Sequence, residues 1–97
     1  MIYHVTKKEA WVHALQKGFY EAASLEKEGF IHASAMPQIT GVLERYFENE
    51  KDLLLLHIDE TRLTSVLKYQ LADSVDEIFP HIFGPINLDA VVKTEEL

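Results

Sequence analysis

One short run of the sequence is apolar without interruption and constrains the fold more than any other stretch. After Asp52 come four leucines, Leu53–Leu56, followed by His57 and Ile58. The run is too short for a helix to be the better interpretation, so it predicts a strand. A strand that is apolar at nearly every position is covered on both faces. We therefore expect a central strand, with further elements packed on each side of it.

Alternating and apolar stretches on both sides of this run predict the other strands. They cover the ranges Ile2–Val5, Phe30–Ser34, Val66–Leu71 and Leu88–Val92. Between them, Ala72–Glu77 has the composition of a loop, and Phe79–Pro85, with two prolines and a glycine, is typical of a rigid aromatic segment. The tail from Thr94 onward is expected to be loose.

Two helices are expected from residue spacing. The first covers Lys7–Lys17; a capping box from Thr6 to Glu9 begins it and Gly18 ends it. The second follows Pro37 and ends near Asn49, with an amphipathic stripe made of Ile39, Val42, Leu43, Tyr46 and Phe47. Together these elements predict a small α+β domain with five to six strands in a mixed or antiparallel sheet and two main helices.

Length and charge limit the functional classes. The 97 residues make one domain, 1–97, and the formal charge of −7 repels a phosphate backbone, so duplex nucleic acid is not an expected partner. A small anionic ligand would need local donors. The chain has no cysteine, no apolar leader and no membrane-length apolar run, so we expect a cytoplasmic protein without a membrane partner.

The stretch from Gly29 to Ser34, with the sequence GFIHAS, carries unusual chemistry for a strand. Side chains alternate between the two faces of a strand, so Phe30, His32 and Ser34 share one face. That face places an imidazole and a hydroxyl where a core strand would carry hydrocarbon. Ser34 could bind a ligand hydroxyl or cap the helix that follows, and the cap is the favoured interpretation.

Three histidines lie in strand or proline contexts: His4, His32 and His81. They could converge on one pocket, or each could satisfy a buried backbone group. A metal is not expected, since no two histidines have the spacing of HExxH and there is no cysteine. Nucleophile-elbow and glycine-rich phosphate motifs are also missing from the sequence. Tyr20 and Phe83 are the aromatic rings best placed to stack on a ligand, because they lie in loop-like or punctuated segments.

Several of these stretches together resemble a family of small bacterial proteins, domain of unknown function 952. The resemblance runs through nearly the whole chain and rests on Tyr3-His4, Gly29–Ser34, Gln38, Asp52–Asp59, Phe79–Pro85 and Leu88–Val92. The family is grouped by fold with the ADP-ribosyltransferases and the NAD-using RNA 2′-phosphotransferases. The resemblance therefore implies an ADP-ribosyltransferase-like fold, a curved and split sheet whose cleft holds NAD in the relatives.

The resemblance also implies roles for individual residues. His4 or His32 would grip a ribose, Tyr20 would stack on nicotinamide, and His81 would be a third site residue. The acidic residue of the relatives has no assigned counterpart, because Tyr69-Gln70 stands where many members have Trp-Glu. Ala33 replaces the usual cysteine, on the face opposite His32, which is a matter of packing.

The leading hypothesis is a histidine-lined cleft that binds NAD or a related nucleotide and carries out ADP-ribosyl or RNA 2′-phosphate transfer, as an NAD-dependent transferase. His32 and His81 are its expected catalytic residues, and His4, Tyr20, Ser34 and Phe83 its expected ligand-binding residues. The alternative is a non-catalytic nucleotide-binding or regulatory module that has lost the catalytic carboxylate. A third hypothesis is a structural partner protein whose histidines serve packing.

Overall fold

The computed structural model describes residues 1–72 and 75–97 of the chain. Within these residues there are eight strands, three α-helices and three short 3₁₀ turns. The strands are β1 (Ile2–Lys7), β2 (Phe19–Tyr20), β3 (Ile31–His32), β4 (Leu53–Ile58), β5 (Val66–Ala72), β6 (Glu77–Phe83), β7 (Ile86–Asn87) and β8 (Val91–Glu96). The helices are α1 (Lys8–Lys17), α2 (Ala23–Glu28) and α3 (Ile39–Tyr46), and the 3₁₀ turns are η1 (Met36–Gln38), η2 (Glu60–Arg62) and η3 (Leu88–Ala90).

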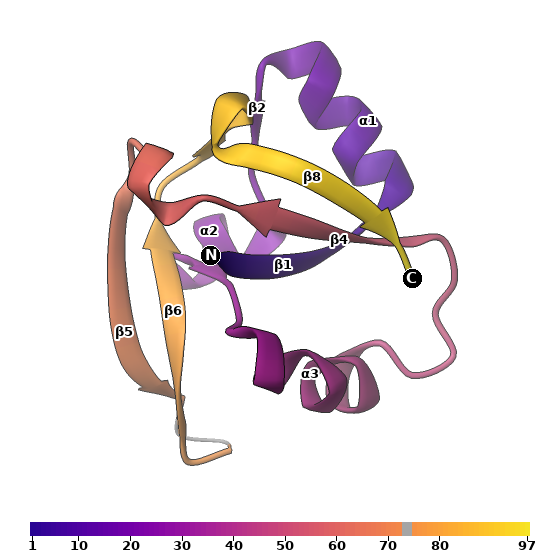
Figure 1. Ribbon diagram of the computed structural model, residues 1–97, viewed down its shortest axis with the longest axis vertical. Helices are drawn as coiled ribbons and strands as arrows, with labels where there is room; N and C mark the ends of the chain where they lie inside the picture. Colours follow the sequence, from indigo (N-terminus) through magenta and orange to yellow (C-terminus); the bar gives the residue numbers. More distant parts are fainter. Residues whose placement is uncertain (73–74) are drawn as a thin grey trace.

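The leucine run forms the central strand of the first sheet, as predicted. β4 lies between β1 and β8, and both of its neighbours are antiparallel to it. One face of this sheet packs in a core cluster that includes Ile2, Leu56 and Ile58, together with Ala14 from α1. The opposite face, with Leu55 among its residues, packs against α3. Figure 1 shows α1 and α3 on opposite sides of this sheet.

A second three-stranded sheet, in the order β3-β6-β5, runs across the first (Figure 1). β2 and β7 form a separate two-stranded pair, and every strand pairing in the described residues is antiparallel. An isolated bridge joins the two larger sheets: the Tyr3 N–H donates to the Ser34 carbonyl at 2.8 Å, and the Ser34 N–H donates back to Tyr3 at 2.7 Å. This bridge brings the segment after β3 against the free edge of β1.

The structure has more strands than the five to six expected, and the six-residue helix α2 is added to the two main helices. Two of the additional strands, β2 and β7, are two-residue pairs that leave little periodic signal. The third is β6, in the segment expected to be rigid and irregular. Its Pro80 lies in a central strand, where proline is uncommon. The Pro80 carbonyl accepts from the Ala33 N–H at 3.0 Å. The N–H that proline lacks would point to the same side, toward Ala33, which lies just after the end of β3.

Three local expectations were wrong at the ends of elements. Thr6 does not cap α1, because β1 continues to Lys7, and Thr6 is buried in the strand. The expected last strand over Leu88–Val92 begins instead as η3, and β8 then runs from Val91 through Glu96 along β4, so the tail is not loose. Gly18 does end α1, with a positive φ of 99°.

Of the loop expected over Ala72–Glu77, residues 73 and 74 lie outside the described residues. The helices in the described part of the chain are all too short or too polar to cross a membrane. The fold is thus a compact α+β domain of antiparallel sheets.

Candidate functional site

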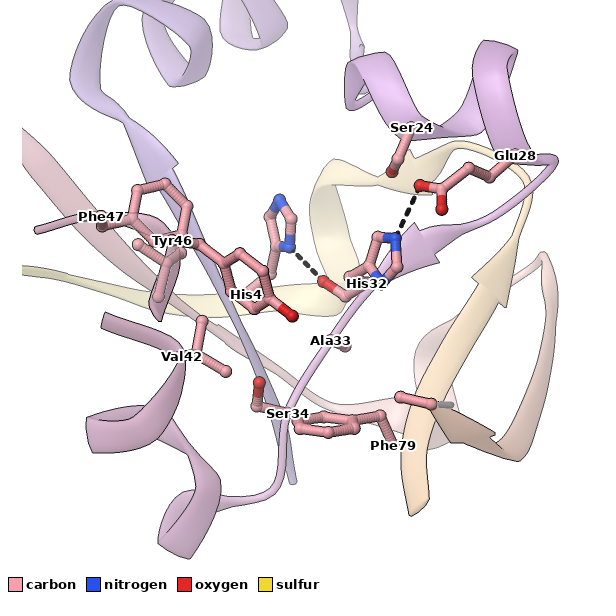
Figure 2. A pocket seen from close by; sticks show the side chains of 12 residues that line it. His4, Ser24, Glu28, His32, Ala33, Ser34, Val42, Tyr46, Phe47 and Phe79 are labelled. Atoms are coloured by element: carbon pink, nitrogen blue, oxygen red, sulfur yellow. Dashed lines mark hydrogen bonds and ion pairs between the residues drawn. The ribbon is translucent and has the colours of Figure 1, made fainter. Parts of the chain in front are cut away.

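A pocket of about 470 Å³ opens beside the free edge of β1, where the two larger sheets meet. Its size falls within the range of small-molecule sites in proteins. Figure 2 shows its side chains converging from β1, α2, the β3 segment and α3. The lining residues are His4, Val5, Ser24, Glu28, His32, Ala33, Ser34, Val42, Tyr46, Phe47, Ala72 and Phe79.

The β3 segment supplies the chemical side of the pocket. Gly29 has a φ of 90°, which favours glycine, and it ends α2 and turns the chain into β3. Ile31 and Ala33 then face the core and are almost completely buried. His32 points the other way and is half-exposed at the pocket. The alternation predicted from the sequence therefore places the imidazole at the pocket wall.

His4 is held at both ring nitrogens. Nδ1 lies 2.5 Å from the His32 carbonyl oxygen, and Nε2 lies 2.9 Å from the Tyr20 hydroxyl. A carbonyl can only accept, so Nδ1 carries the proton and Nε2 of the neutral ring accepts from Tyr20. The single proton of the Tyr20 hydroxyl goes to His4, so in the 2.8 Å bond between Tyr20 and Thr6 the Thr6 hydroxyl donates and the Tyr20 oxygen accepts. These bonds fix the ring at the pocket wall.

The environment of His4 keeps its ring uncharged at neutral pH. Burial lowers the pKa of His4 to about 4, and the hydrogen bond to the His32 carbonyl opposes this effect only in part. The nearby His32 imidazole lowers the pKa further. At pH 7 this part of the pocket wall therefore carries no positive charge.

Glu28 forms a carboxylate–imidazole pair with His32, and the sequence did not point to it. Glu28 Oε2 accepts from His32 Nε2 at 2.8 Å, and both side chains are half-exposed (Figure 2). The only sequence signal was their separation of four residues, which helix geometry would have made neighbours. Here Gly29 interrupts the helix between them, and the sharp turn keeps the two side chains together.

Ser34 lies on the pocket wall and does not cap a helix, so the favoured cap interpretation was wrong. The Ala35 N–H at the start of η1 donates instead to the Gln38 side-chain oxygen at 2.9 Å. Ser34 is buried, and its hydroxyl has no hydrogen-bond partner among the described residues. Figure 2 shows the hydroxyl directed into the pocket, which leaves it available to a ligand.

Aromatic and aliphatic side chains form the opposite wall. Val42 and Tyr46 come from α3 and Phe47 is its C-cap, whereas Phe79 comes from β6 and lies beside Ser34 on the other side of the pocket (Figure 2). The first three belong to the amphipathic stripe predicted from the sequence. Tyr46 is nevertheless 57% exposed, so the end of this stripe lines a pocket rather than packing inward.

The remaining sequence-predicted residues lie behind the pocket wall. His81 pairs with His32 across the strands, with their ring centroids 5.4 Å apart, but it does not line the pocket. Phe83 packs against Phe30 at 5.4 Å between ring centroids. Tyr20 supports His4 from behind. The structure therefore groups all three predicted histidines, while only His4 and His32 reach the cavity.

His81 is stacked on one aromatic neighbour and is only partly hydrogen-bonded. Its ring lies 4.1 Å from that of Phe30, and its Nδ1 is 2.8 Å from the Gln70 side-chain oxygen. Nε2 is buried without a hydrogen-bond partner among the described residues. Burial lowers the pKa of His81, with a smaller contribution from His32 in the same direction. In residues 1–72 and 75–97, no group of three or more histidines or carboxylates is placed to hold a metal ion.

One family model and the solved structures of one protein match nearly the whole chain. Residues 5–94 match the family described as protein of unknown function (DUF952). The crystal structure of protein CC0527 from Caulobacter crescentus is 28% identical, covers 99% of this chain and 84% of its own, and superimposes with a TM-score of 0.89. The solution NMR structure of CC0527 is 28% identical, covers 99% of this chain and 83% of its own, with a TM-score of 0.85. No curated protein matches the sequence.

Proposed function

The chain belongs to the DUF952 family of proteins of unknown function, and we propose from the geometry of its pocket that it binds the ribose and base of NAD or a related nucleotide. The observation that carries the proposal is the division of the pocket into two unlike walls. One wall presents Ser34, His32 and Glu28, with Phe79 beside Ser34, and the other presents the ring of Tyr46 (Figure 2).

Each wall suits one part of a nucleoside. A carboxylate accepts hydrogen bonds from ribose hydroxyls, as it does in dinucleotide-binding folds. The free Ser34 hydroxyl can donate to or accept from the same sugar. Tyr46 has a large aromatic ring that is partly exposed to solvent, and a base can stack on it. The ligand proposed here would therefore place its sugar against β3 and its base against α3.

The transfer reaction proposed for this site uses His32 as the base. The free nitrogen of His32 would take the proton of an acceptor hydroxyl, and Glu28 would hold the resulting imidazolium through Nε2. The acceptor oxygen would then bond to the ribose carbon as the bond from that carbon to nicotinamide breaks. Glu28 thereby offers the carboxylate that the sequence left unassigned. The ADP-ribosyltransferase-like fold and the cytoplasmic location remain parts of this proposal.

His81, Tyr20 and Phe83 take supporting positions in the proposal. Tyr20 orients His4 through the bond to Nε2, and His81 packs against the His32 ring. Phe83 reaches the site only through Phe30. We therefore assign all three as positioning residues and keep direct contact with the ligand for His4, His32 and Ser34.

A non-catalytic nucleotide-binding module is the second candidate. The observation in its favour is Gln70, which hydrogen-bonds to His81 and takes the place of the glutamate that the family resemblance implies. In this version the pocket and its ligand are the same, and only the transfer step is missing.

Binding is tested by calorimetry with NAD, ADP-ribose and nicotinamide riboside. We expect heat of binding from NAD or nicotinamide riboside, and we expect Tyr46→Ala to weaken it about tenfold, from the loss of one stacked ring. The matched control is Tyr69→Ala, because Tyr69 is 58% exposed, close to the 57% of Tyr46, yet lies outside the pocket. If none of the three compounds binds, the proposal is wrong.

Catalysis is tested by nicotinamide release from NAD. The transferase predicts slow release by the wild-type protein, lowered at least about 100-fold in His32→Ala, which is the lower range for removal of a general base. Binding of NAD without any release would select the non-catalytic module.

A further inference from the structure

We infer that the pocket selects the phosphate-free nucleoside part of its ligand and keeps phosphate groups outside, in the solvent. The inference rests on the proposed function and narrows it to a ligand class, a nucleoside whose ring is neutral or cationic. The observations that carry it are the charges on the lining, the state of the nearby backbone N–H groups and the helix end at the pocket.

The lining carries a negative group and no permanently positive one. Glu28 contributes a carboxylate, whereas no lysine or arginine lines the pocket in the described residues. His4 has both nitrogens engaged and is uncharged at neutral pH. His32 already has Glu28 as its partner. A phosphate entering this pocket would meet Glu28 without a compensating cation, and the whole chain adds a charge of −7.

Three consecutive backbone N–H groups of the β3 segment, which could otherwise replace a cation, are already used. Anion sites without lysine or arginine depend on free amide donors. Here the Ala33 N–H donates to Pro80 at 3.0 Å and the Ser34 N–H donates to Tyr3 at 2.7 Å. The Ala35 N–H donates to the Gln38 side chain at 2.9 Å. These three amides are therefore not free to bind a phosphate, whereas the side-chain groups of the polar wall suit sugar hydroxyls.

The end of α3 at the pocket adds to this preference. Tyr46 is the last residue of α3, and Phe47 is its C-cap, so the pocket meets the helix at its C-terminus. The unpaired carbonyls of a helix C-terminus carry partial negative charge, which favours cations and disfavours anions. Tyr46 and Phe79 can in addition bind a cationic ring by cation–π attraction.

One cation lies close enough to offer an alternative. The Arg45 guanidinium carbon is 5.7 Å from the centroid of the Tyr46 ring, but Arg45 does not line the pocket. Its side chain runs back along α3 toward Gly41. A phosphate held inside the pocket would require this arginine to turn inward, and that requirement makes the inference testable.

The experiment compares nicotinamide riboside with its 5′-monophosphate by calorimetry at one ionic strength. We expect the nucleoside to bind at least as tightly as the monophosphate. Glu28→Gln should improve the monophosphate relative to the nucleoside by about fivefold, the effect of removing one nearby charge in a solvated site. The matched control is Glu26→Gln, which makes the same change of charge on α2 outside this pocket.

The outcomes separate this inference from the proposed function. A monophosphate that binds tenfold more tightly than the nucleoside, with the gain lost in Arg45→Gln, would overturn the inference and leave the proposed nucleotide site in place. Lack of binding by both compounds, by NAD and by ADP-ribose would overturn the inference and the proposed function together. A nucleoside preference reduced in Glu28→Gln and kept in Glu26→Gln supports the inference.

Discussion

His4 on β1 and His81 on β6 both contact His32, one through its main chain and the other through its ring. His4 binds the His32 carbonyl through Nδ1 and the Tyr20 hydroxyl through Nε2. His81 packs its ring against that of His32 and binds Gln70 through Nδ1, while its Nε2 is buried without a partner among the described residues. The two histidines therefore differ in how many of their ring nitrogens are hydrogen-bonded.

This difference in hydrogen bonding distinguishes the histidine that lines the pocket, His4, from the one behind its wall, His81. Burial lowers the pKa of both, so the direction of the pKa shift does not distinguish them. Their hydrogen-bond partners do, because His4 is fixed in one tautomer at the wall of the pocket, whereas His81 keeps an unsatisfied nitrogen behind it. An unsatisfied buried nitrogen costs about 1–3 kcal/mol. The two residues should therefore respond in opposite ways to replacement by an apolar side chain.

The largest effect is expected from His4→Leu. The substitution leaves the His32 carbonyl without its partner and removes one of the two partners of the Tyr20 hydroxyl, which keeps Thr6; the loss of a bonded partner costs about 1–3 kcal/mol. We expect the free energy of unfolding to fall by roughly 2–4 kcal/mol at pH 7, measured by urea denaturation. The control is His13→Leu on the exposed face of α1, with an expected change within about 0.5 kcal/mol. A loss below about 1 kcal/mol for His4→Leu would show that its two bonds contribute little.

The next effect in size is the pH dependence of stability. The pKa of His4 in the folded chain is about 4, below the ordinary value of 6.5, so the unfolded chain binds more protons in between. Stability is therefore full above pH 6.5 and is lost as the pH falls toward 4. We expect a loss on the order of 2 kcal/mol, with His81 acting in the same direction.

Urea denaturation at a series of pH values from 7 to about 4 checks this effect. His4→Leu removes the titrating group and should flatten most of the slope. If the free energy of unfolding of the wild-type protein does not change over this pH range, the His4 ring is protonated in the folded protein at little cost. Burial would then not be what keeps this ring uncharged.

Elements with a local signature were predicted from the sequence, and elements that depend on distant partners were not. The leucine run and the glycine at the end of α1 act within a few residues, and both predictions held. β8 was missed at its end because Thr94, Glu95 and Glu96 are polar, and only pairing with β4 makes them a strand. β6 was missed because Pro80 reads as a break, although its missing donor faces the end of β3.

The same distinction between local signatures and distant partners applies to the residues of the candidate site. Alternation along the GFIHAS stretch placed His32 at the pocket wall. Glu28 and Tyr46 could not be found this way, since one resembles an ordinary surface carboxylate and the other an ordinary residue of an amphipathic stripe. Their roles depend on a sharp turn at Gly29 and on where α3 ends, and both are consequences of the tertiary fold.

The smallest effect, and the sharpest contrast with His4, is expected from His81→Leu. The substitution removes the unpaired Nε2 from a residue that is 4% exposed, and leucine is similar to histidine in volume. Gln70 is exposed and can bond to water in place of His81. The lost bond and the lost stacking on Phe30 offset part of the gain, so we expect a change within about 1 kcal/mol, toward higher stability, in urea denaturation at pH 7. A destabilisation as large as that of His4→Leu would show that Nε2 has a partner in solution, and His81 would then belong with His4 as a fully bonded histidine.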